Sequence, residues 1–161
     1  MTTKTKSELE GKKAPAISLK DENGDKFSLK DQLGSYVLIY FYPKDDTPGC
    51  TTEACSIRDH SKQINKASLK VFGISPDDET HHQKFIGKYN LNFPLLCDTE
   101  HKVAEKYEVW VEKNMYGKKY MGIQRDSFLI DPNGTIVKHY KKVKPDDHIG
   151  EVLEDLKGLK V

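Results

Sequence analysis

The sequence predicts a single α/β domain, because short β-prone runs alternate with helical segments along its 161 residues. Two continuous apolar runs, 36–42 and 71–74, are typical of strands buried on both faces of a sheet. A chain of this length can bury a core without disulfide bridges, and neither a repeat nor a linker divides it. We therefore expect one domain over residues 1–161, with only the polar segment 1–13 loose.

The first half of the chain predicts an N-terminal hairpin followed by two strand–helix units. The hairpin has apolar alternation on both sides of Asn23-Gly24, a pair typical of a two-residue turn. The strand at 36–42 leads into a helix that begins at about Cys50. The strand at 71–74 leads into a second helix, for which Ser75 is the predicted N-cap.

The second half of the chain predicts short elements that complete the sheet. In order, we expect a strand at 95–96, a helix over 99–107, an extended loop over 108–124, a hairpin of 127–130 with 136–143, and a helix from residue 149. The loop is expected because its composition is aromatic and basic and lacks a clear period. Its side chains would either edge an apolar pocket or pack in the core.

Composition narrows the functions that the chain can have. Its 26 Lys and Arg residues are interleaved with 25 Asp and Glu residues, so no basic stripe marks a surface for nucleic acid. No apolar run approaches the length of a membrane span, and residues 1–16 lack the apolar centre of a signal peptide. We therefore expect a cytoplasmic protein with neither nucleic acid nor membrane as a partner. In that reducing compartment the three cysteines are not a disulfide framework and matter through their reactivity.

Two of the cysteines, Cys50 and Cys55, follow the first buried strand closely. They could form a structural bridge, half of a metal site, a redox pair, or two buried thiols that are near each other by chance. The strand ends at Tyr42 and Pro43 stops sheet pairing, so the turn that follows places Cys50 at a helix N-terminus. Backbone N–H groups and the helix dipole there stabilise a thiolate, the nucleophilic form of cysteine. Thr47 can direct its hydroxyl at the sulfur or at a substrate oxygen.

The spacing of the pair excludes two of these alternatives. Along an intact helix, five residues separate the Cα atoms by roughly 8–9 Å, whereas a disulfide needs about 7 Å or less. A permanent bridge is therefore not expected, and a transient one requires the first turns of the helix to unwind. A zinc site would need a second Cys or His pair, and the six histidines show no such pair. We expect neither a metal nor another cofactor, which leaves a redox pair or two idle thiols.

The segment 43–55, PKDDTPGCTTEAC, closely resembles the active-site motif of peroxiredoxins. Its second cysteine, five residues after the first, is similar to the Q, or bacterioferritin-comigratory, branch of that family. GKKAPAISL, VFGISPDD, FPLLCD and YGKKYMGIQRDSFLIDPNG resemble the same branch in the same order, so the resemblance covers nearly the whole chain. It implies a thioredoxin-like fold, in which helices flank a central mixed sheet and the N-terminal hairpin is an extension.

The resemblance implies a thiol peroxidase that reduces hydrogen peroxide and organic hydroperoxides in antioxidant defence. Cys50 would attack the O–O bond as a thiolate and become a sulfenic acid. Pro43 would shield the sulfur from solvent, and Thr47 would hydrogen-bond the peroxide oxygens. Arg125 would stabilise the thiolate and polarise the peroxide. A guanidinium suits this role because it is always charged and presents several fixed donors.

The same resemblance implies that Cys55 is the resolving cysteine. It would condense with the sulfenic acid to give an intramolecular disulfide, which thioredoxin or a similar dithiol would reduce. Because the pair cannot meet on an intact helix, turnover is expected to include local unwinding between Cys50 and Cys55. The resemblance also favours a monomer.

Three further residues have two interpretations each. Glu53 is either an acid in the first turn of the helix or a member of the active-site hydrogen-bond network. Cys97 is either a small buried residue or a second thiol partner. Asp126 stands where the family has a small residue, and it could tether Arg125 or partly neutralise it.

Two other functions would use the same residues. A thiol–disulfide oxidoreductase or redox sensor would use both cysteines without efficient peroxide turnover, but it has no need of a peroxide-activating arginine. A non-enzymatic binding or chaperone module would keep its function when Cys50 is replaced by serine. Peroxide consumption by wild type, Cys50→Ser and Cys55→Ser therefore tests the peroxidase against both alternatives.

Overall fold

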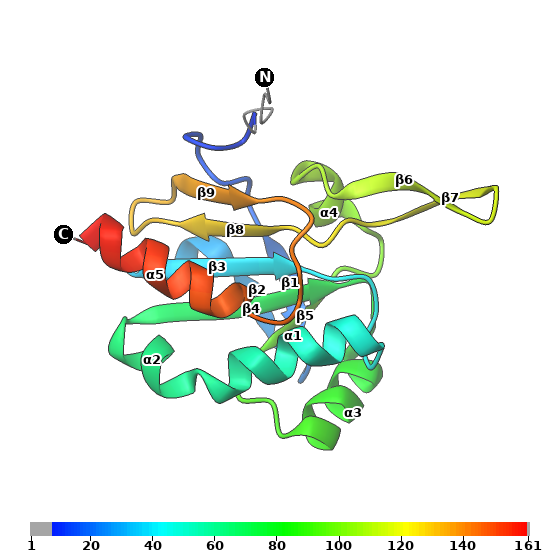
Figure 1. Ribbon diagram of the computed structural model, residues 1–161, viewed down its shortest axis with the longest axis horizontal. Coiled ribbons are helices and arrows are strands. Elements are labelled where there is room, and N and C mark those ends of the chain that lie inside the picture. Colours follow the sequence, from blue (N-terminus) through cyan, green and yellow to red (C-terminus); the bar gives the residue numbers. More distant parts are fainter. Residues whose placement is uncertain (1–7, 161) are drawn as a thin grey trace.

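Strands and helices alternate through residues 8–160, which are the residues that the computed structural model describes (Figure 1). The strands are β1 (Ser18–Asp21), β2 (Lys26–Ser28), β3 (Tyr36–Phe41), β4 (Leu69–Ser75), β5 (Leu95–Cys97), β6 (Trp110–Met115), β7 (Lys118–Ile123), β8 (Ser127–Ile130) and β9 (Ile136–Tyr140). The helices are η1 (Leu29–Gln32, a 3-10 helix), α1 (Pro48–Asp59), α2 (Ser61–Lys66), α3 (Glu79–Tyr89), α4 (Lys102–Lys106) and α5 (His148–Lys160).

Seven of the described strands form one mixed sheet in the order β2-β1-β5-β4-β3-β8-β9. The central strands β5, β4 and β3 are parallel to one another, and the outer strands join them in antiparallel pairs. The predicted hairpin β1–β2 extends one edge of this sheet through the pairing of β1 with β5. The central mixed sheet that the sequence predicts is therefore confirmed.

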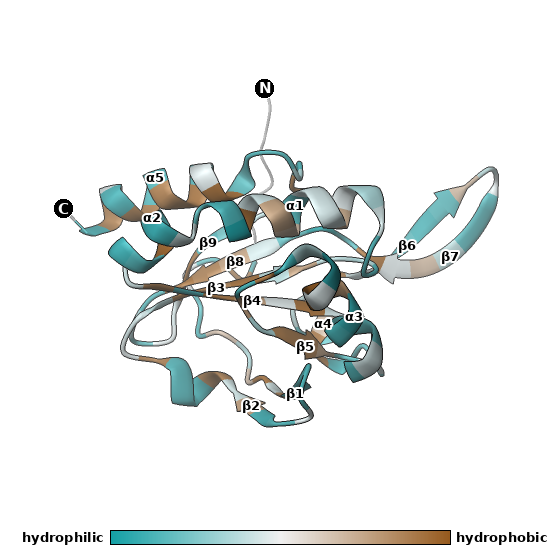
Figure 2. Ribbon diagram, turned by 90° about the horizontal axis from the view of Figure 1, so that it is seen from below, coloured by the Kyte–Doolittle hydropathy of each residue, from teal (hydrophilic) through white to brown (hydrophobic). Residues whose placement is uncertain are grey.

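Strand β3 contributes side chains to both faces of the sheet. Leu38 and Tyr40 pack in a core that also contains residues of α1 and α5, whereas Val37 and Ile39 pack in a second core with residues of β2 and α4. All four side chains are at most 1% exposed, which explains why the strand is an unbroken apolar run. Figure 2 shows α1, α2 and α5 together on one side of the sheet. The chain leaves β3 directly into the loop that precedes α1.

The segment 108–124, predicted to be an extended loop, is instead a β-hairpin. Strands β6 and β7 pair in antiparallel register along their whole length, and the hairpin projects from the body of the molecule (Figure 1). The prediction was wrong because the turn is Tyr116-Gly117, where both residues have positive φ, 53° and 81°. Asn-Gly is the usual sequence for such a two-residue turn, and Tyr-Gly gives a weaker signal.

Two helices begin later than the sequence predicts. The N-cap of α3 is Asp78, whose carboxylate accepts from the N–H of His81 at 3.0 Å, and not Ser75. Helix α4 begins only at Lys102 because the carboxylate of Asp98 accepts from N–H groups in its first turn. The cap of α3 is thus three residues beyond the predicted one, whereas Asp98 lies before α4 and accepts from N–H groups of its first turn.

Part of the N-terminal segment is held against β9. The N–H of Gly11 donates to the Ile136 carbonyl at 2.7 Å, and the N–H of Ile136 donates to the Lys12 carbonyl at 2.9 Å. These residues belong to the segment 1–13 that was predicted to be loose, and here that prediction is wrong; residues 1–7 lie outside the described residues. Between residues 8 and 160, no helix has the length and apolarity needed to cross a membrane.

Candidate active site

The candidate site lies where the chain leaves β3 and begins α1. Thr47 is the N-cap of α1, Pro48 occupies its first turn, and Cys50 follows two residues later. The helix therefore begins slightly before the predicted position and leaves Cys50 in its first turn. The Cys50 side chain is buried, with the residue 2% exposed. The unpaired N–H groups and the dipole of this turn favour a negative charge on a sulfur placed here.

Arg125 brings a positive charge to Cys50 from the connection between β7 and β8. Its Nη2 lies 3.4 Å from the Cys50 Sγ, and its Nη1 donates to Oε1 of Glu53 at 2.9 Å. Gly49 permits this approach, because a Cβ at that position would lie only 3.0 Å from Nη2. Burial disfavours the charge, but Cys50 and Glu53 outweigh it and raise the pKa of Arg125. The guanidinium is therefore a fixed cation shared by two acidic groups.

Glu53 belongs to this network and is not an acid of the first helical turn. It lies one turn beyond Cys50, is 1% exposed, and contacts Arg125 through Oε1, while its Oε2 has no hydrogen-bond partner among the described residues. Burial raises the pKa of Glu53 to about 7 although Arg125 opposes the shift. Near neutral pH this carboxyl group therefore exists in both protonation states.

Glu53 should make the stability of the reduced protein depend on pH. Its pKa is raised from 4.5 to about 7, so between these values the folded state keeps a proton that the unfolded state has lost. Stability from this group is therefore present below pH 4.5 and is lost as the pH rises through about 7, by up to ~3 kcal/mol. Glu53→Gln keeps an oxygen for Arg125 but cannot titrate. Urea unfolding at about pH 5 and about pH 8 should show the variant gaining stability relative to wild type at the higher pH; an equal difference at both values would contradict this.

Pro43 and Thr47 join the site through the loop 43–47 rather than through direct contacts with the sulfur. Both residues are half-buried. The hydroxyl of Thr47 donates to the Lys44 carbonyl at 2.9 Å and so closes the loop on itself. The structure thus brings Cys50, Glu53 and Arg125 into one hydrogen-bonded cluster, and it places Pro43 and Thr47 on the segment that leads into that cluster.

The cysteines are all free thiols, and two of them lie on the same unbroken helix. Cys55 is half-exposed, whereas Cys50 is buried. With α1 continuous from Pro48 to Asp59, helical geometry keeps the two Cα atoms roughly 8–9 Å apart. Cys97 lies on β5, is 8% exposed and donates to the Asp21 carbonyl, which favours the interpretation as a small buried residue.

Asp126 does not tether Arg125, although the sequence left that alternative open. Its carboxylate accepts from the Gln124 side chain at 2.9 Å and from the Lys142 N–H at 3.0 Å, and it lies 2.8 Å from Nε2 of His139. These three contacts hold the Asp126 carboxylate with partners other than Arg125, Cys50 and Glu53. The charge of Arg125 is therefore shared with Glu53 and not with its neighbour in sequence.

Tyr40 is a member of the site that sequence analysis missed. It is fully buried on β3, and burial, followed by the negative charges of Glu53 and Cys50, raises its pKa well above the ordinary value. Gly73 on β4 makes room for the ring, because a Cβ there would lie 2.9 Å from the Tyr40 hydroxyl oxygen. The alternation of side chains along β3 could have identified it, because Tyr40 and Tyr42 share one face and pack in the same core as Cys50.

One group of described residues has the spacing of metal ligands. Candidate ligand atoms of Asp45, Asp77 and His82 lie within 4.8 Å of one another. Two of these residues already form an ion pair, with Nδ1 of His82 2.6 Å from Oδ2 of Asp45. A metal would have to displace the proton that holds this pair together. The donor set fits an ion pair better than a metal.

The chain belongs to the AhpC/TSA family, whose sequence profile matches residues 10–139. It is similar to peroxiredoxin Bcp of Bacillus subtilis, with 48% identity over 149 residues that cover 92% of this chain and 95% of that protein. Peroxiredoxin Bcp of Escherichia coli is 46% identical over 144 residues, 89% of this chain and 92% of that protein.

Solved structures show the same likeness in three dimensions. Bacterioferritin comigratory protein of Xanthomonas campestris, described for its alkyl peroxide reduction activity, has a TM-score of 0.85 at 37% identity over 90% of this chain and 92% of that chain. The thioredoxin-like fold and the predicted place in the Q, or bacterioferritin-comigratory, branch of the peroxiredoxins are thereby confirmed. Thiol-dependent peroxide reduction is the activity of that class.

Proposed function

We propose that this protein reduces hydroperoxides through a thiolate on Cys50. The observation that carries the proposal is the buried Cys50 sulfur in the first turn of α1, with the Arg125 guanidinium 3.4 Å away. A helix N-terminus and a fixed cation both stabilise negative charge, and the same donors can support the charge that develops on a departing oxygen. Two idle thiols would need neither group.

The first step moves an oxygen atom from the peroxide to Cys50. The thiolate attacks one peroxide oxygen, the S–O bond forms as the O–O bond breaks, and the other oxygen leaves with the electron pair. After protonation that oxygen is released as water from hydrogen peroxide or as an alcohol from an organic hydroperoxide. Arg125 would stabilise the charge as it passes from sulfur to the leaving oxygen. Thr47 would orient the peroxide once its hydroxyl turns from the Lys44 carbonyl, and Pro43 would limit access of water.

The second step forms a disulfide between Cys50 and Cys55. The Cys55 thiol attacks the sulfenic sulfur, water leaves, and the resulting disulfide is reduced by an external dithiol such as thioredoxin. We place this cycle in the cytoplasm of a monomeric protein, since both cysteines lie on one chain and thioredoxin is kept reduced there. Organic hydroperoxides are proposed alongside hydrogen peroxide, supported by the alkyl peroxide reduction described for the Xanthomonas relative.

Peroxide consumption coupled to thioredoxin, its reductase and NADPH tests the proposed function. We expect turnover with hydrogen peroxide and with an alkyl hydroperoxide, each measured as NADPH oxidation. Replacing thioredoxin by dithiothreitol tests peroxide reduction independently of thioredoxin binding, because a small dithiol needs no docking surface. Exchange of protein disulfides without peroxide consumption would favour the oxidoreductase or sensor instead.

Oxidation should open α1 between Cys50 and Cys55. A disulfide between them needs Cα atoms within about 7 Å, which an intact helix does not allow. We therefore expect amide hydrogen exchange over residues 50–55 to become much faster in the disulfide form than in the reduced form. Exchange in β3 should not change. Protection of α1 that is the same in both forms would contradict this expectation.

Cys55→Ser provides the control for the opening of α1. This variant is expected to oxidise once at Cys50 with the rate of wild type and then to stop as the sulfenic acid, which a dimedone-type reagent traps. Because no disulfide can form, α1 should keep its protection against exchange after peroxide treatment. Loss of protection in this variant would mean that the sulfenic acid itself opens the helix.

A further inference from the structure

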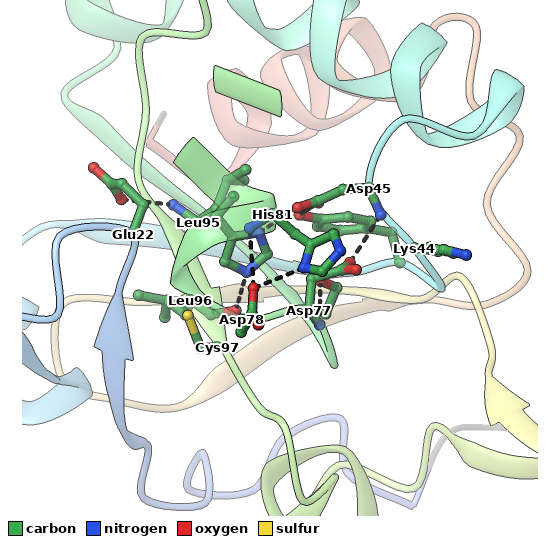
Figure 3. Close-up of polar contacts among 12 residues, drawn as sticks. Glu22, Lys44, Asp45, Asp77, Asp78, His81, Leu95, Leu96 and Cys97 are labelled. Atoms are coloured by element: carbon green, nitrogen blue, oxygen red, sulfur yellow. Dashed lines mark hydrogen bonds and ion pairs between the residues drawn. The ribbon is translucent and has the colours of Figure 1, made fainter. Parts of the chain in front are cut away.

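The loop 43–47, which precedes α1, is attached to α3 through the buried carboxylate of Asp45. Oδ1 of Asp45 accepts from the Tyr42 hydroxyl at 2.5 Å, and Oδ2 lies 2.6 Å from Nδ1 of His82 on α3. The N–H of Asp45 donates to Oδ2 of Asp77 at 2.8 Å. Figure 3 shows Asp45 and Asp77 close to each other, with Leu96 and Cys97, the last residues of β5, on the other side of Asp78. These hydrogen bonds of Asp45 therefore join the loop to Tyr42, to His82 on α3 and to Asp77.

His82 is a charged partner for Asp45. Its side chain is fully buried, and Nε2 lies 3.0 Å from the Leu96 carbonyl oxygen, which can only accept, so Nε2 carries a proton. Burial lowers the pKa of His82, but hydrogen bonding and charge from Asp45, with a contribution from Cys97, outweigh it and raise the pKa to about 10. His82 is thus an imidazolium that donates from both ring nitrogens.

A second, exposed connection joins the same loop to the same helix. The carboxylate of Asp46 pairs with Nζ of Lys88 at 2.8 Å and accepts from the Tyr89 hydroxyl at 2.9 Å. Exposed ion pairs of this kind contribute little to stability, whereas removing one partner of a buried pair leaves a buried charge uncompensated and is strongly destabilising. The position of the loop therefore depends mainly on His82 and Asp45.

We propose that His82 is a positioning residue for peroxide reduction, because it holds Asp45 and thereby fixes the loop that carries Pro43 and Thr47. This inference rests on the proposed function of Cys50. Groups that orient a reactant must be held to within a fraction of an ångström, and a displacement of about 1 Å can cost roughly 10²-fold in rate. No residue on α1 takes part in the Asp45 contacts, so the loop keeps its support while α1 opens.

The test compares two neighbouring histidines of α3, His82→Gln and His81→Gln. His81 is exposed, and within residues 8–160 its ring pairs only with Asp78 at the start of the helix, so His81→Gln is the matched control. Two rates are measured at Cys50 in each protein: oxidation by hydrogen peroxide in a single turnover, and alkylation by iodoacetamide. We expect His82→Gln to slow peroxide oxidation by about tenfold or more and alkylation by less than about twofold, because alkylation does not need the peroxide-orienting loop. His81→Gln should change neither rate.

Other outcomes would overturn the inference. Equal losses of both rates would mean that His82 acts on the thiol or on the fold in general, and unchanged rates would mean that the loop does not need it. If His82→Gln fails to fold, the nitrogen chemical shifts of the His82 ring in the wild-type protein test the proposal instead. At about pH 8 both ring nitrogens should be protonated in the reduced form and in the disulfide form. A neutral His82 ring, or a ring whose protonation differs between the two forms, would contradict the proposal that His82 holds Asp45 in both. Peroxide oxidation of wild type is measured first, so failure of the proposed function is recognised separately.

Discussion

Cys50→Ser is expected to abolish peroxide turnover and to leave the fold in place. A serine hydroxyl does not ionise near neutral pH, so the helix N-terminus and Arg125 have no thiolate to stabilise. The replacement is nearly isosteric, and the residue is buried, so the packing around it changes little. NADPH-coupled turnover should fall to the background rate with either hydrogen peroxide or an alkyl hydroperoxide, and no sulfenic acid should form at this position.

Cys97→Ser is the matched control for this loss, because it replaces another buried cysteine, which lies on strand β5. We expect it to keep turnover within about twofold of wild type, as replacing a small structural residue by one of similar volume should. Mass spectrometry of peroxide-treated protein gives an independent measurement, in which Cys50 should be linked to Cys55. A Cys50–Cys97 link, or substantial turnover by Cys50→Ser, would contradict the assigned roles.

The part of the site that lies close together in sequence could be predicted from local physical chemistry. A strand that ends at Tyr42, a proline, and a turn before Cys50 place the sulfur at a helix N-terminus, and the structure has it there. Arg125 could be identified only through the resemblance to a family, since 75 positions separate it from Cys50. Nothing in its immediate sequence distinguishes it from a surface arginine.

The parts that could not be predicted depend on contacts between distant segments. His82 lies on a helix whose sequence shows only a histidine beside another histidine, and its burial follows from packing against the loop at Asp45 and the end of β5. Glu53 has the same character: only the approach of Arg125 and the surrounding core make it a buried acid with a raised pKa. The hairpin turn at Tyr116 was missed because an unusual residue adopts the left-handed conformation there.

Arg125→Met is expected to slow oxidation of Cys50 by hydrogen peroxide by roughly 10²–10³-fold, the range seen when one preorganised charge-stabilising donor is removed. Methionine keeps much of the apolar stem of arginine but provides no charge for the thiolate or for the leaving oxygen. Arg125→Lys should give an intermediate rate, because an ammonium keeps the charge but cannot contact Cys50 and Glu53 through separate nitrogens of a rigid fork. Single-turnover oxidation at several peroxide concentrations measures the second-order rate constant directly.

The Arg125 substitution also removes the only hydrogen-bond partner that the Glu53 side chain has among residues 8–160, so loss of stability must be separated from loss of chemistry. Without the guanidinium, the buried carboxyl is expected to remain protonated to higher pH, and Arg125→Met should be less stable than wild type above neutral pH. Adding Glu53→Gln removes the titrating group and should recover most of that stability. It should not recover the rate, because the missing charge beside Cys50 is still missing. Recovery of both stability and rate in the double variant would show that Arg125 acts by satisfying Glu53 and not by activating the peroxide.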